Sequence, residues 1–377
     1  MKYMGSKRSM LSNGLGQLIC EQAKYARRIV DLFCGSASIS WFASENTKLP
    51  VLSADLQLYS VILARAITGR TIPLDIEPIF TEWLQTTRNN LAESNYQSAS
   101  INLNKYENDV GKLVDKARIL CTKSLSIGPI WSAYGGYYFS PIQALTFDYL
   151  IKYLPKKEPF RTVATAAILH SAIKCVASPG HTAQPFQPTE GASKFLLEAW
   201  NREPIQLCQQ ALGILCPRHA LTCGEAIVED AINIANTLNE DDLVIIDPPY
   251  SEVQYSRFYH VLETIARHYC GPVSGTGRYP PISERPQSKF CNRSQSKIAF
   301  QRLIKALKKA KATLIVTFPS GECTNGLSGD FIKKVTQKSH VTQECVISGR
   351  FSTLGGNNKH RTSRKSSNEL LLLLKPK

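Results

Sequence analysis

The stretch LVIIDPPY, which runs from Leu243 to Tyr250, decides the fold of this 377-residue chain. Four consecutive apolar residues, three of them β-branched, predict a buried strand. The two prolines end that strand because neither can donate a hydrogen bond to a strand ladder. Asp247 is therefore expected at the carboxyl end of a strand, which in an open parallel sheet is the edge where ligands bind. A carboxylate, a rigid pair of peptide carbonyls and an aromatic ring then converge on one pocket.

The same residues suit an exocyclic amino group on a planar base. The lone pair of such an amine is delocalised into the ring, and two acceptors on its N–H groups localise the pair on nitrogen. Asp247 and the carbonyl of Pro248 are the candidate acceptors. Pro249 keeps them fixed, so that they need no reorganisation, and Tyr250 is the candidate stacking ring. An isolated Asp-Pro typically marks only a strand-ending turn, but Asp-Pro-Pro-Tyr directly after an apolar strand favours a catalytic role.

Composition and charge bound the class of protein. The formal net charge of +15 predicts a polyanionic partner, most simply nucleic acid. No apolar run approaches the ~20 residues that span a bilayer, and the first residues lack an apolar secretory segment, so we expect a cytoplasmic protein without a membrane partner. The 11 cysteines include no C-x-x-C pair and no matching histidine cluster, which predicts reduced, mostly buried thiols and no metal site.

A second motif lies in the first part of the chain. The stretch RIVDLFCGSAS, which starts at Arg28, predicts a strand that runs into a loop of small residues before a helix over 39–46. Small residues let a ligand approach the backbone, and the helix N-terminus offers free N–H groups. A second strand ends at Asp55, about 20 residues after Gly35, the spacing at which α/β folds present an acid to ribose hydroxyls. The pair indicates a nucleoside-bearing cofactor. Gly35 is alone, with Ala37 at the place of a second glycine, which disfavours an NAD-dependent enzyme.

The remaining pattern predicts an α/β protein with a doubly wound mixed sheet and an inserted, largely helical segment. The sheet is expected to resume over 219–226 in a short strand that ends at the acid Glu225, and the last strands, between 344 and 374, look like an antiparallel pair. Residues from about 70 to 220 lack strand–helix alternation. Their aromatic residues, such as those over 131–139, suit stacking on bases, or alternatively form the core of the insertion.

Two acid-poor stretches carry regularly spaced cations. One is the Gly/Pro-rich segment that begins at Gly271, in which Glu284 is the only acid up to Lys297, and the other covers 355–367. Such segments suit contacts with nucleic-acid phosphates, although a solvated surface loop has the same composition. The candidate phosphate-binding residues are Arg278, Arg285, Lys289, Arg293, Lys359, Arg361 and Arg364.

Taken together, these residues resemble the adenine-N6-specific DNA methyltransferases that use S-adenosylmethionine. The resemblance is to their alpha arrangement, in which a target recognition domain separates the cofactor half from the catalytic half. The two anchors are DLFCGS at 31–36 and DPPY at 247–250. The opening YMGSK, from Tyr3 to Lys7, is similar to the N-terminal cofactor motif of that family, an aromatic residue followed four positions later by lysine. The resemblance implies a Rossmann-like methyltransferase fold.

The resemblance also implies domains and residue roles. The catalytic domain would cover 1–68 and 220–377, and the target recognition domain 69–219. Asp55 would hold the ribose hydroxyls of the cofactor, and Glu225 would lie near its adenine. The base would be bound by Asp247, Pro248, Pro249 and Tyr250. The implied cofactor-binding residues are Tyr3, Lys7, Asp31, Phe33, Gly35, Ser36, Asp55, Glu225 and Ala226.

The implied reaction is methyl transfer to N6 of an adenine flipped out of double-stranded DNA, without a metal. Restriction–modification or genome marking would be its setting, with a cognate restriction endonuclease as a further partner. Two alternatives stay open. The same acceptors suit the N4 amine of cytosine, although Asp at the first position of the motif favours adenine. The chain could also be a non-catalytic nucleic-acid-binding module on the same fold.

Overall fold

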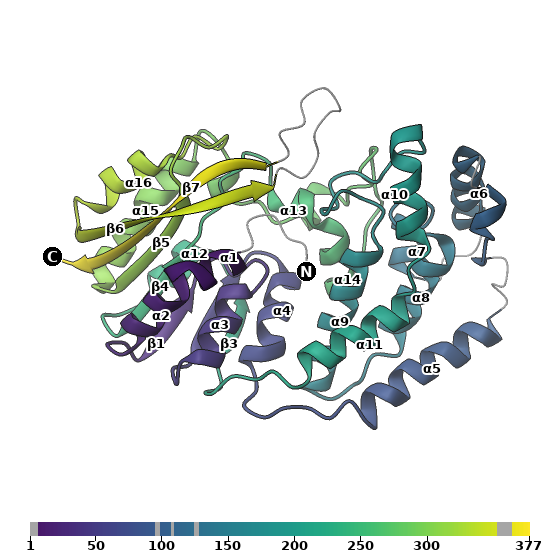
Figure 1. Cartoon of the computed structure of the whole chain (residues 1–377), viewed down its shortest axis with the longest axis horizontal. Coiled ribbons are helices and arrows are strands. Elements are labelled where there is room, and N and C mark those ends of the chain that lie inside the picture. Colours follow the sequence, from purple (N-terminus) through teal and green to yellow (C-terminus); the bar gives the residue numbers. More distant parts are fainter. Residues whose placement is uncertain (1–6, 95–98, 107–108, 124–127, 353–363) are drawn as a thin grey trace. The chain divides into compact units, whose positions relative to one another are not determined.

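The structure, a computed structural model, describes residues 7–94, 99–106, 109–123, 128–352 and 364–377. The chain forms two compact units (Figure 1). The sheet unit contains the described residues up to Ile72, together with Arg218–Ser256 and Pro286–Lys377. The helical unit contains Pro73–Pro217 and Arg257–Arg285. The insertion predicted over 69–219 thus lies mostly in the helical unit, which also takes in a later segment that we expected in the catalytic part.

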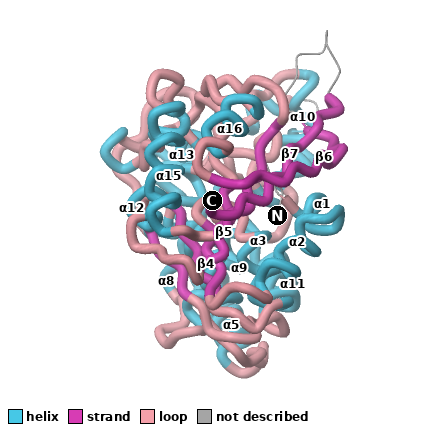
Figure 2. Tube along the Cα trace, turned by 90° about the vertical axis from the view of Figure 1, so that its left-hand side faces the viewer, coloured by secondary structure: helices cyan, strands magenta, loops and turns pink. Residues whose placement is uncertain are grey.

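One seven-stranded sheet organises the sheet unit, in the order β3-β2-β1-β4-β5-β7-β6. Strands β1 to β5 pair in parallel, whereas β7 runs antiparallel to both β5 and β6. Figure 2 shows β6 and β7 as two long strands side by side. The strands are β1 (Arg28–Asp31), β2 (Val51–Asp55), β3 (Glu225–Val228), β4 (Asp242–Ile246), β5 (Thr313–Pro319), β6 (His340–Ser352) and β7 (Arg364–Pro376).

The strand order reverses next to β1, and this reversal positions the site. From β1 the chain steps to β2 on one side, and it later returns to place β4 on the other side. In doubly wound sheets such a reversal leaves a crevice at the carboxyl ends of the two central strands, because the connecting helices leave in opposite directions. The crevice is therefore expected beyond Asp31 and Ile246, the last residues of β1 and β4.

Helices cover both faces of the sheet because alternate strand residues point to opposite faces. Val30 and Val244 pack on one side with α12, α15 and α16, whereas Ile29 and Ile245 pack on the other with α2 and α3. This is the predicted α/β architecture with a doubly wound mixed sheet. The helices of the sheet unit are α1 (Arg8–Met10), a π-helical turn (Leu11–Leu15), α2 (Gly16–Ala23), α3 (Ser38–Asn46), α4 (Leu58–Thr68), α12 (Ala231–Ala235), the 3-10 turn Lys289–Cys291, α15 (Ser296–Ala310) and α16 (Gly329–Thr336).

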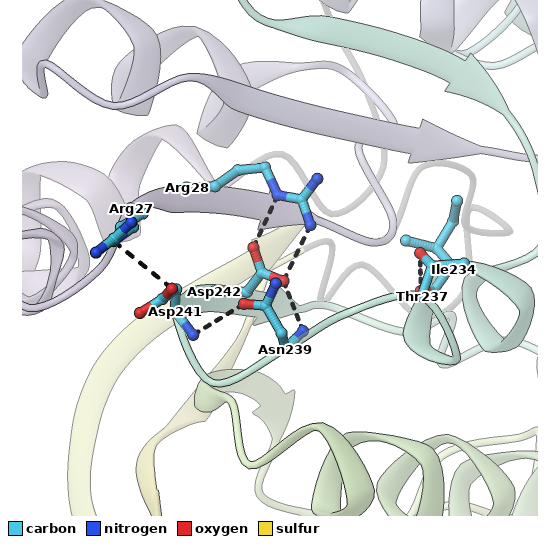
Figure 3. Close-up of polar contacts among 7 residues, drawn as sticks. All are labelled: Arg27, Arg28, Ile234, Thr237, Asn239, Asp241 and Asp242. Carbon is cyan, nitrogen blue, oxygen red and sulfur yellow. Dashed lines mark hydrogen bonds and ion pairs between the residues drawn. The ribbon is translucent and has the colours of Figure 1, made fainter.

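A bidentate ion pair joins the amino ends of β1 and β4 (Figure 3). The guanidinium of Arg28 donates from Nε to Oδ1 of Asp242 at 2.7 Å and from its terminal nitrogen to Oδ2 at 3.0 Å. The backbone N–H of Asn239 donates to the same Oδ2 at 2.9 Å. Arg27 and Asp241, the neighbours of the pair, form a longer and much more exposed contact of 3.6 Å. This edge of the sheet is thus fixed by matched charges.

One expected strand lies elsewhere than predicted. We predicted that a strand would end at Glu225, but β3 begins at that residue, so the prediction was wrong. The reason is that the residues before it bond to other segments and not to a strand. Leu221 donates its backbone N–H to Ser44, and Gly224 donates to Thr68. The helical run from Arg8 to Ala23 is interrupted at Gly14, whose φ is 104°.

The helical unit is built around α9, whose residues Thr162 to Ile173 are all buried. Trp131, Tyr134 and Tyr138 are also fully buried, so these aromatic residues form the core of the insertion, as the second of our two interpretations predicts. The helices of this unit are α5 (Ile79–Glu93), the 3-10 turn Leu103–Tyr106, α6 (Val110–Lys123), α7 (Pro129–Tyr134), α8 (Pro141–Lys152), α9 (Phe160–Cys175), α10 (Glu190–Trp200), α11 (Pro204–Leu215), α14 (His260–Arg267) and the 3-10 turn Ile282–Glu284, with α13 (Tyr255–Phe258) at the boundary in sequence.

Two further expectations concern the described residues as a group. The described cysteines are all free thiols, and most of them are buried. Among the residues that the structure describes, no helix has both the length and the apolar composition needed to cross a bilayer.

Candidate active site

The two sequence motifs meet at the carboxyl edge of the sheet. Asp31 ends β1, and Asp247 directly follows β4, the parallel neighbour of β1. The register places Asp31 beside Ile245, two residues before Asp247. The negative charge of Asp247 is close enough to contribute to the raised pKa of Asp31. Asp31 and Asp247, which are 216 positions apart in sequence (247 − 31), thus lie at the same carboxyl edge of the sheet.

The glycine loop after β1 is tied to the end of β2. Gly35 has a left-handed backbone, with φ 45°, and its N–H donates to Oδ2 of Asp55 at 2.9 Å. The N–H of Gln57 donates to the other oxygen of Asp55, also at 2.9 Å. Ala37, just before α3, is left-handed as well, with φ 61°, a conformation that costs a residue with a Cβ about 1–2 kcal/mol. The loop is therefore held in a strained shape by the acid at the end of the next strand.

Asp31, at the end of β1, links the start of this loop to α3. Its side chain is 1% exposed, and its Oδ2 accepts a hydrogen bond of 2.7 Å from the hydroxyl of Ser40 in α3. The hydroxyl of Ser53 in β2 donates in turn to that of Ser40 at 2.9 Å. Burial raises the pKa of Asp31 to about 7, although the Ser40 bond acts in the opposite direction. Asp31 therefore links β1, β2 and α3 while it titrates near neutral pH.

Asp247 belongs to a cluster of buried charges. Lys7 Nζ lies 3.1 Å from Asp247 Oδ1 and 3.2 Å from Oε2 of Glu369 on β7. The side chains of Lys7, Asp247 and Glu369 are only 4%, 15% and 8% exposed. Burial raises the pKa of Asp247, which the charge of Lys7 partly offsets. Burial acts to lower the pKa of Lys7, but the two carboxylates outweigh it and hold this pKa above its usual range.

The two oxygens of the Asp247 carboxylate have different surroundings. Oδ1 takes both the Lys7 contact and a hydrogen bond of 2.9 Å from the hydroxyl of Thr317 in β5. Within the described part of the chain, no hydrogen bond goes to Oδ2, and Oδ1 is the oxygen that Lys7 contacts at 3.1 Å. One carboxylate oxygen thus orients the group. The other can accept a hydrogen bond at the carboxyl edge of the sheet, where the crevice is expected.

The Asp-Pro-Pro-Tyr turn is held by a buried amide. Asn325, which is fully buried, donates from Nδ2 to the carbonyl of Pro249 at 2.7 Å and to the carbonyl of Phe290 at 2.9 Å. The Pro249 carbonyl is thereby engaged by the protein itself, whereas the carbonyl of Pro248 is the one that we expect at the base. Tyr250 is half-buried, with Lys7 Nζ 5.8 Å from the centre of its ring. Burial raises the pKa of the Tyr250 hydroxyl, so the ring is neutral over the ordinary pH range.

Three residues of this site were missed by sequence reasoning: Thr317, Asn325 and Glu369. Thr317 is a polar residue inside the apolar run TLIVTF, and Glu369 immediately precedes five leucines. These polar residues in or beside apolar strands are signals that the sequence does contain. The sequence offers no such signal for Asn325, which lies in a loop between β5 and α16.

The predicted cofactor residues have different positions. Phe33 packs edge to face against Phe290, with ring centres 5.1 Å apart, and the hydroxyl of Ser36 lies 3.2 Å from that of Ser38. Lys7 contacts the two carboxylates described above, and Tyr3 lies outside the described residues.

Two of the predicted cofactor residues lie away from this edge. Because β3 runs parallel to β2, Glu225 and Ala226 lie toward the amino end of the sheet, whereas Val228 lies beside Asp55. The acid that follows β3 at the carboxyl edge is Glu229, whose N–H donates to the carbonyl of Asp55 at 3.1 Å.

The predicted phosphate-binding residues are divided among several segments. Arg278 and Arg285 lie in the helical unit, and Lys289 and Arg293 in the sheet unit. Arg364 begins β7, but its side chain is not described. Lys359 and Arg361 lie outside the described residues.

Two tyrosines of the helical unit each hold a pair of guanidinium groups. Arg118 and Arg278 lie 4.4 Å and 4.3 Å from the centre of the Tyr137 ring. Arg257 and Arg285 lie 4.7 Å and 5.3 Å from the centre of the Tyr279 ring. Arg278 is further fixed because its Nε donates to the carbonyl of Ala133 at 2.8 Å. Stacking on the two tyrosine rings, and for Arg278 also a backbone carbonyl, therefore holds these cations in place.

In the part of the chain that the structure describes, no group of three or more His, Cys, Asp or Glu side chains could hold a metal ion.

None of the curated proteins matches the chain. A family model does match, that of the D12 class N6 adenine-specific DNA methyltransferases, over residues 3–122 and 221–315. The matched residues are more than half of the chain and include both motifs at the carboxyl edge. The chain therefore belongs to the D12 class N6 adenine-specific DNA methyltransferase family.

Proposed function

We propose that this protein transfers the methyl group of S-adenosylmethionine to N6 of an adenine flipped out of double-stranded DNA. The observation that carries the proposal is the meeting of two motifs at one sheet edge. The loop of Gly35 and the end of β2 lie on one side, and the open oxygen of Asp247 lies on the other. A cofactor and a base bound to these two places would be adjacent, and adjacency is the main requirement of a direct transfer.

The cofactor side has the chemistry that a nucleoside-bearing sulfonium compound needs. S-Adenosylmethionine, when bound, supplies a methyl group on a positively charged sulfur. Gly35 lets a ligand approach the backbone closely because it has no Cβ, and Asp55 offers a carboxylate to ribose hydroxyls. Phe33 offers an apolar surface beside them. We assign the acid near the adenine of the cofactor to Glu229 in place of Glu225, because Glu229 lies beside Asp55.

The acceptor side can bind an aromatic amine. Oδ2 of Asp247 and the carbonyl of Pro248 would accept the two N–H bonds of N6 and so direct its lone pair outward. Tyr250 would stack on the base, and its neutral ring suits this contact. Oδ2 is also the atom that would take the proton which N6 gives up after transfer. Thr317, Asn325 and Lys7 fix these groups before the base arrives, which is electrostatic preorganisation.

DNA binding is supported by the charge of the chain and by the helical unit. The net charge of +15 suits a polyanion, and Tyr137 and Tyr279 each hold two guanidinium groups in the helical unit. We assign target recognition to the helical unit. Extrusion of the base would cost a few kcal/mol, which contacts with phosphates and with Tyr250 would offset. We place the activity in restriction–modification or genome marking, with a cognate restriction endonuclease as the partner to test.

The experiment is a methyl-transfer assay on double-stranded DNA with S-adenosylmethionine, followed by digestion to nucleosides and mass spectrometry. We expect N6-methyladenine. The variant Asp247→Ala should lose about 10³-fold or more in kcat, because it removes a charged acceptor in the transition state. Its Kd for S-adenosylmethionine should stay within about twofold, because Asp55 and the Gly35 loop are intact. Asp241→Ala, an exposed acid at the opposite end of the sheet, is the matched control and should keep full activity.

The alternatives give different outcomes in the same assay. Methylation of cytosine N4 would move the proposal to the other exocyclic amine. Absence of both transfer and cofactor binding would instead indicate a nucleic-acid-binding module. Equal loss of transfer and cofactor binding in Asp247→Ala would contradict the role that we assign to this carboxylate.

A further inference from the structure

Glu369 is a buried acid that the proposed reaction does not itself require. It lies on β7, in register with Pro319 at the carboxyl end of β5, and the five leucines that follow it are buried. A carboxylate in such a place is costly because it must leave water, and an apolar residue would continue the strand at less cost. The charge of Glu369 lies at a point of the strand that reaches Lys7.

Lys7 contacts two acids, of which we assign only Asp247 to the binding of the base. Its ammonium group has three N–H donors, one of which donates to Glu369 at 3.2 Å, while Asp247 Oδ1 lies at 3.1 Å. The three ionised groups have a net charge of −1. If the charge of Glu369 were absent, Lys7 would be drawn to Asp247 alone, where it could bridge both carboxylate oxygens.

We propose that Glu369 is a positioning residue of the methyl-acceptor site, which holds Lys7 against Oδ1 of Asp247 and so keeps Oδ2 available to the amino group of the base. This inference rests on the proposed function. It assigns to Glu369 no contact with substrate or cofactor. Its effect passes through Lys7, whose position decides both the direction and the residual charge of the Asp247 carboxylate.

The surroundings of Glu369 support this role. Burial raises the pKa of Glu369, which Lys7 partly offsets, and the negative charge of Asp247 raises it further. Among the described residues, Tyr250 and Cys323 also interact with Glu369, and burial raises the pKa of both, so they are neutral near pH 7. Lys7 is thus the cation through which Glu369 acts on Asp247. Removal of the Glu369 charge should let Lys7 stabilise the Asp247 carboxylate more strongly, which lowers the pKa of Asp247.

A double-mutant cycle tests the inference with Glu369→Gln, Lys7→Met and the double variant. We expect Glu369→Gln to lower kcat about tenfold or more, a typical effect of a group that orients a reacting residue. The Kd for S-adenosylmethionine should be unchanged, and the acid limb of the kcat–pH profile should move to lower pH. In the Lys7→Met background, Glu369→Gln should cause no further loss, because the residue through which it acts is absent.

Two outcomes would overturn the inference. One is an unchanged kcat in Glu369→Gln, and the other is an equal loss of kcat in both backgrounds. Wild-type protein that transfers no methyl group would instead contradict the proposed function, so the two failures are distinct. Asp242→Asn is the matched control, because it removes a buried acid from an ion pair at the other end of the sheet. It should lower stability without a change in kcat.

A second variant covers the case in which Glu369→Gln does not fold, as judged by loss of cofactor binding. Glu369→Asp keeps the charge but withdraws it by one methylene from Lys7. It should bind S-adenosylmethionine as the wild type does and should have a reduced kcat. A wild-type kcat in this variant, together with an unfolded Glu369→Gln, would assign the residue to stability and overturn the inference.

Discussion

The two ends of the same sheet use charge in opposite ways. At the amino end, Arg28 and Asp242 form a bidentate pair in which one cation meets one acid (Figure 3). At the carboxyl end, Lys7 is shared by Asp247 and Glu369, and Asp31 is held by a serine hydroxyl in place of a cation. A pair of matched charges satisfies both partners and stabilises the fold without leaving an acceptor for a ligand. An excess of buried acid is unfavourable for folding and is expected where a ligand completes the site.

The strand order explains why the excess of acid lies at one end. Loops at the carboxyl ends of β1 and β4 diverge, since the connections leave on either side of the sheet, and this leaves room for ligands. At the amino ends, the turn before β4 folds directly onto β1, where Arg27 donates its backbone N–H to Asp241 at 2.8 Å. We therefore expect substitutions at the carboxyl end of the sheet to lower activity and substitutions at the amino end to lower stability.

The largest effect on stability is expected at the amino end. Asp242→Asn should lower the free energy of unfolding by about 3 kcal/mol, because it removes a buried, charged acceptor that takes two hydrogen bonds from the guanidinium of Arg28. The measurement is chemical denaturation followed by circular dichroism. Asp241→Asn, in the adjacent exposed pair, is the control and should change this free energy by less than about 1 kcal/mol. Equal effects of the two substitutions would contradict the difference between the buried and the exposed pair.

A smaller, pH-dependent effect is expected from Asp31. Its pKa is raised in the folded protein to about 7 from an ordinary value of 3.8, so the folded state binds the proton more tightly than the unfolded state. The contribution of this group to stability is fully present below its unfolded pKa and is lost as the pH rises through its folded pKa. Between pH 5 and pH 8 this loss amounts to about 2–3 kcal/mol. Asp31→Asn should remove that part of the pH dependence, as measured by denaturation at several pH values.

The comparison of variant with wild type is needed because Asp148 behaves similarly. This acid of the helical unit is buried, and its pKa is also raised to about 7 by burial, although it accepts the N–H groups of Ile130 and Trp131. Both acids contribute the same sign of slope in the wild type. An Asp31→Asn variant whose pH dependence equals that of the wild type would show that Asp31 is ionised in the fold.

The sequence predicts the parts of the site that are formed by neighbouring segments. LVIIDPPY identifies its own strand end, and Gly35 and Asp55 are 20 residues apart and joined by one hydrogen bond. The fold class follows in the same way, because apolar runs and helix periodicity are local properties. Lys7 could be predicted as functional, but its partner could not, because Glu369 is 362 residues away.

Long-range pairing depends on strand order, which no local pattern determines. β7 lies between β5 and β6, and this insertion is what brings Glu369 to the carboxyl end of β5. The sequence shows only that a charged residue precedes five leucines. Glu225 illustrates the converse error, because an acid next to a short apolar run can begin a strand as well as end it. Only the pairing of β3 with β2 shows to which edge it belongs.

The smallest effect is expected at the cofactor side of the carboxyl end. Asp55→Asn should weaken the binding of S-adenosylmethionine by about tenfold to thirtyfold. The ribose hydroxyls would exchange a charged acceptor for a neutral one, and the charged acceptor binds them more strongly by about 1.5–2 kcal/mol. The amide oxygen can still accept one N–H, from Gly35 or Gln57, and the N–H that loses its acceptor should lower the free energy of unfolding by about 1–2 kcal/mol, less than at Asp242. Titration calorimetry measures the affinity, and denaturation measures the stability. A variant that loses stability and keeps its affinity would make Asp55 resemble Asp242, and the division between the two ends of the sheet would then fail on its cofactor side.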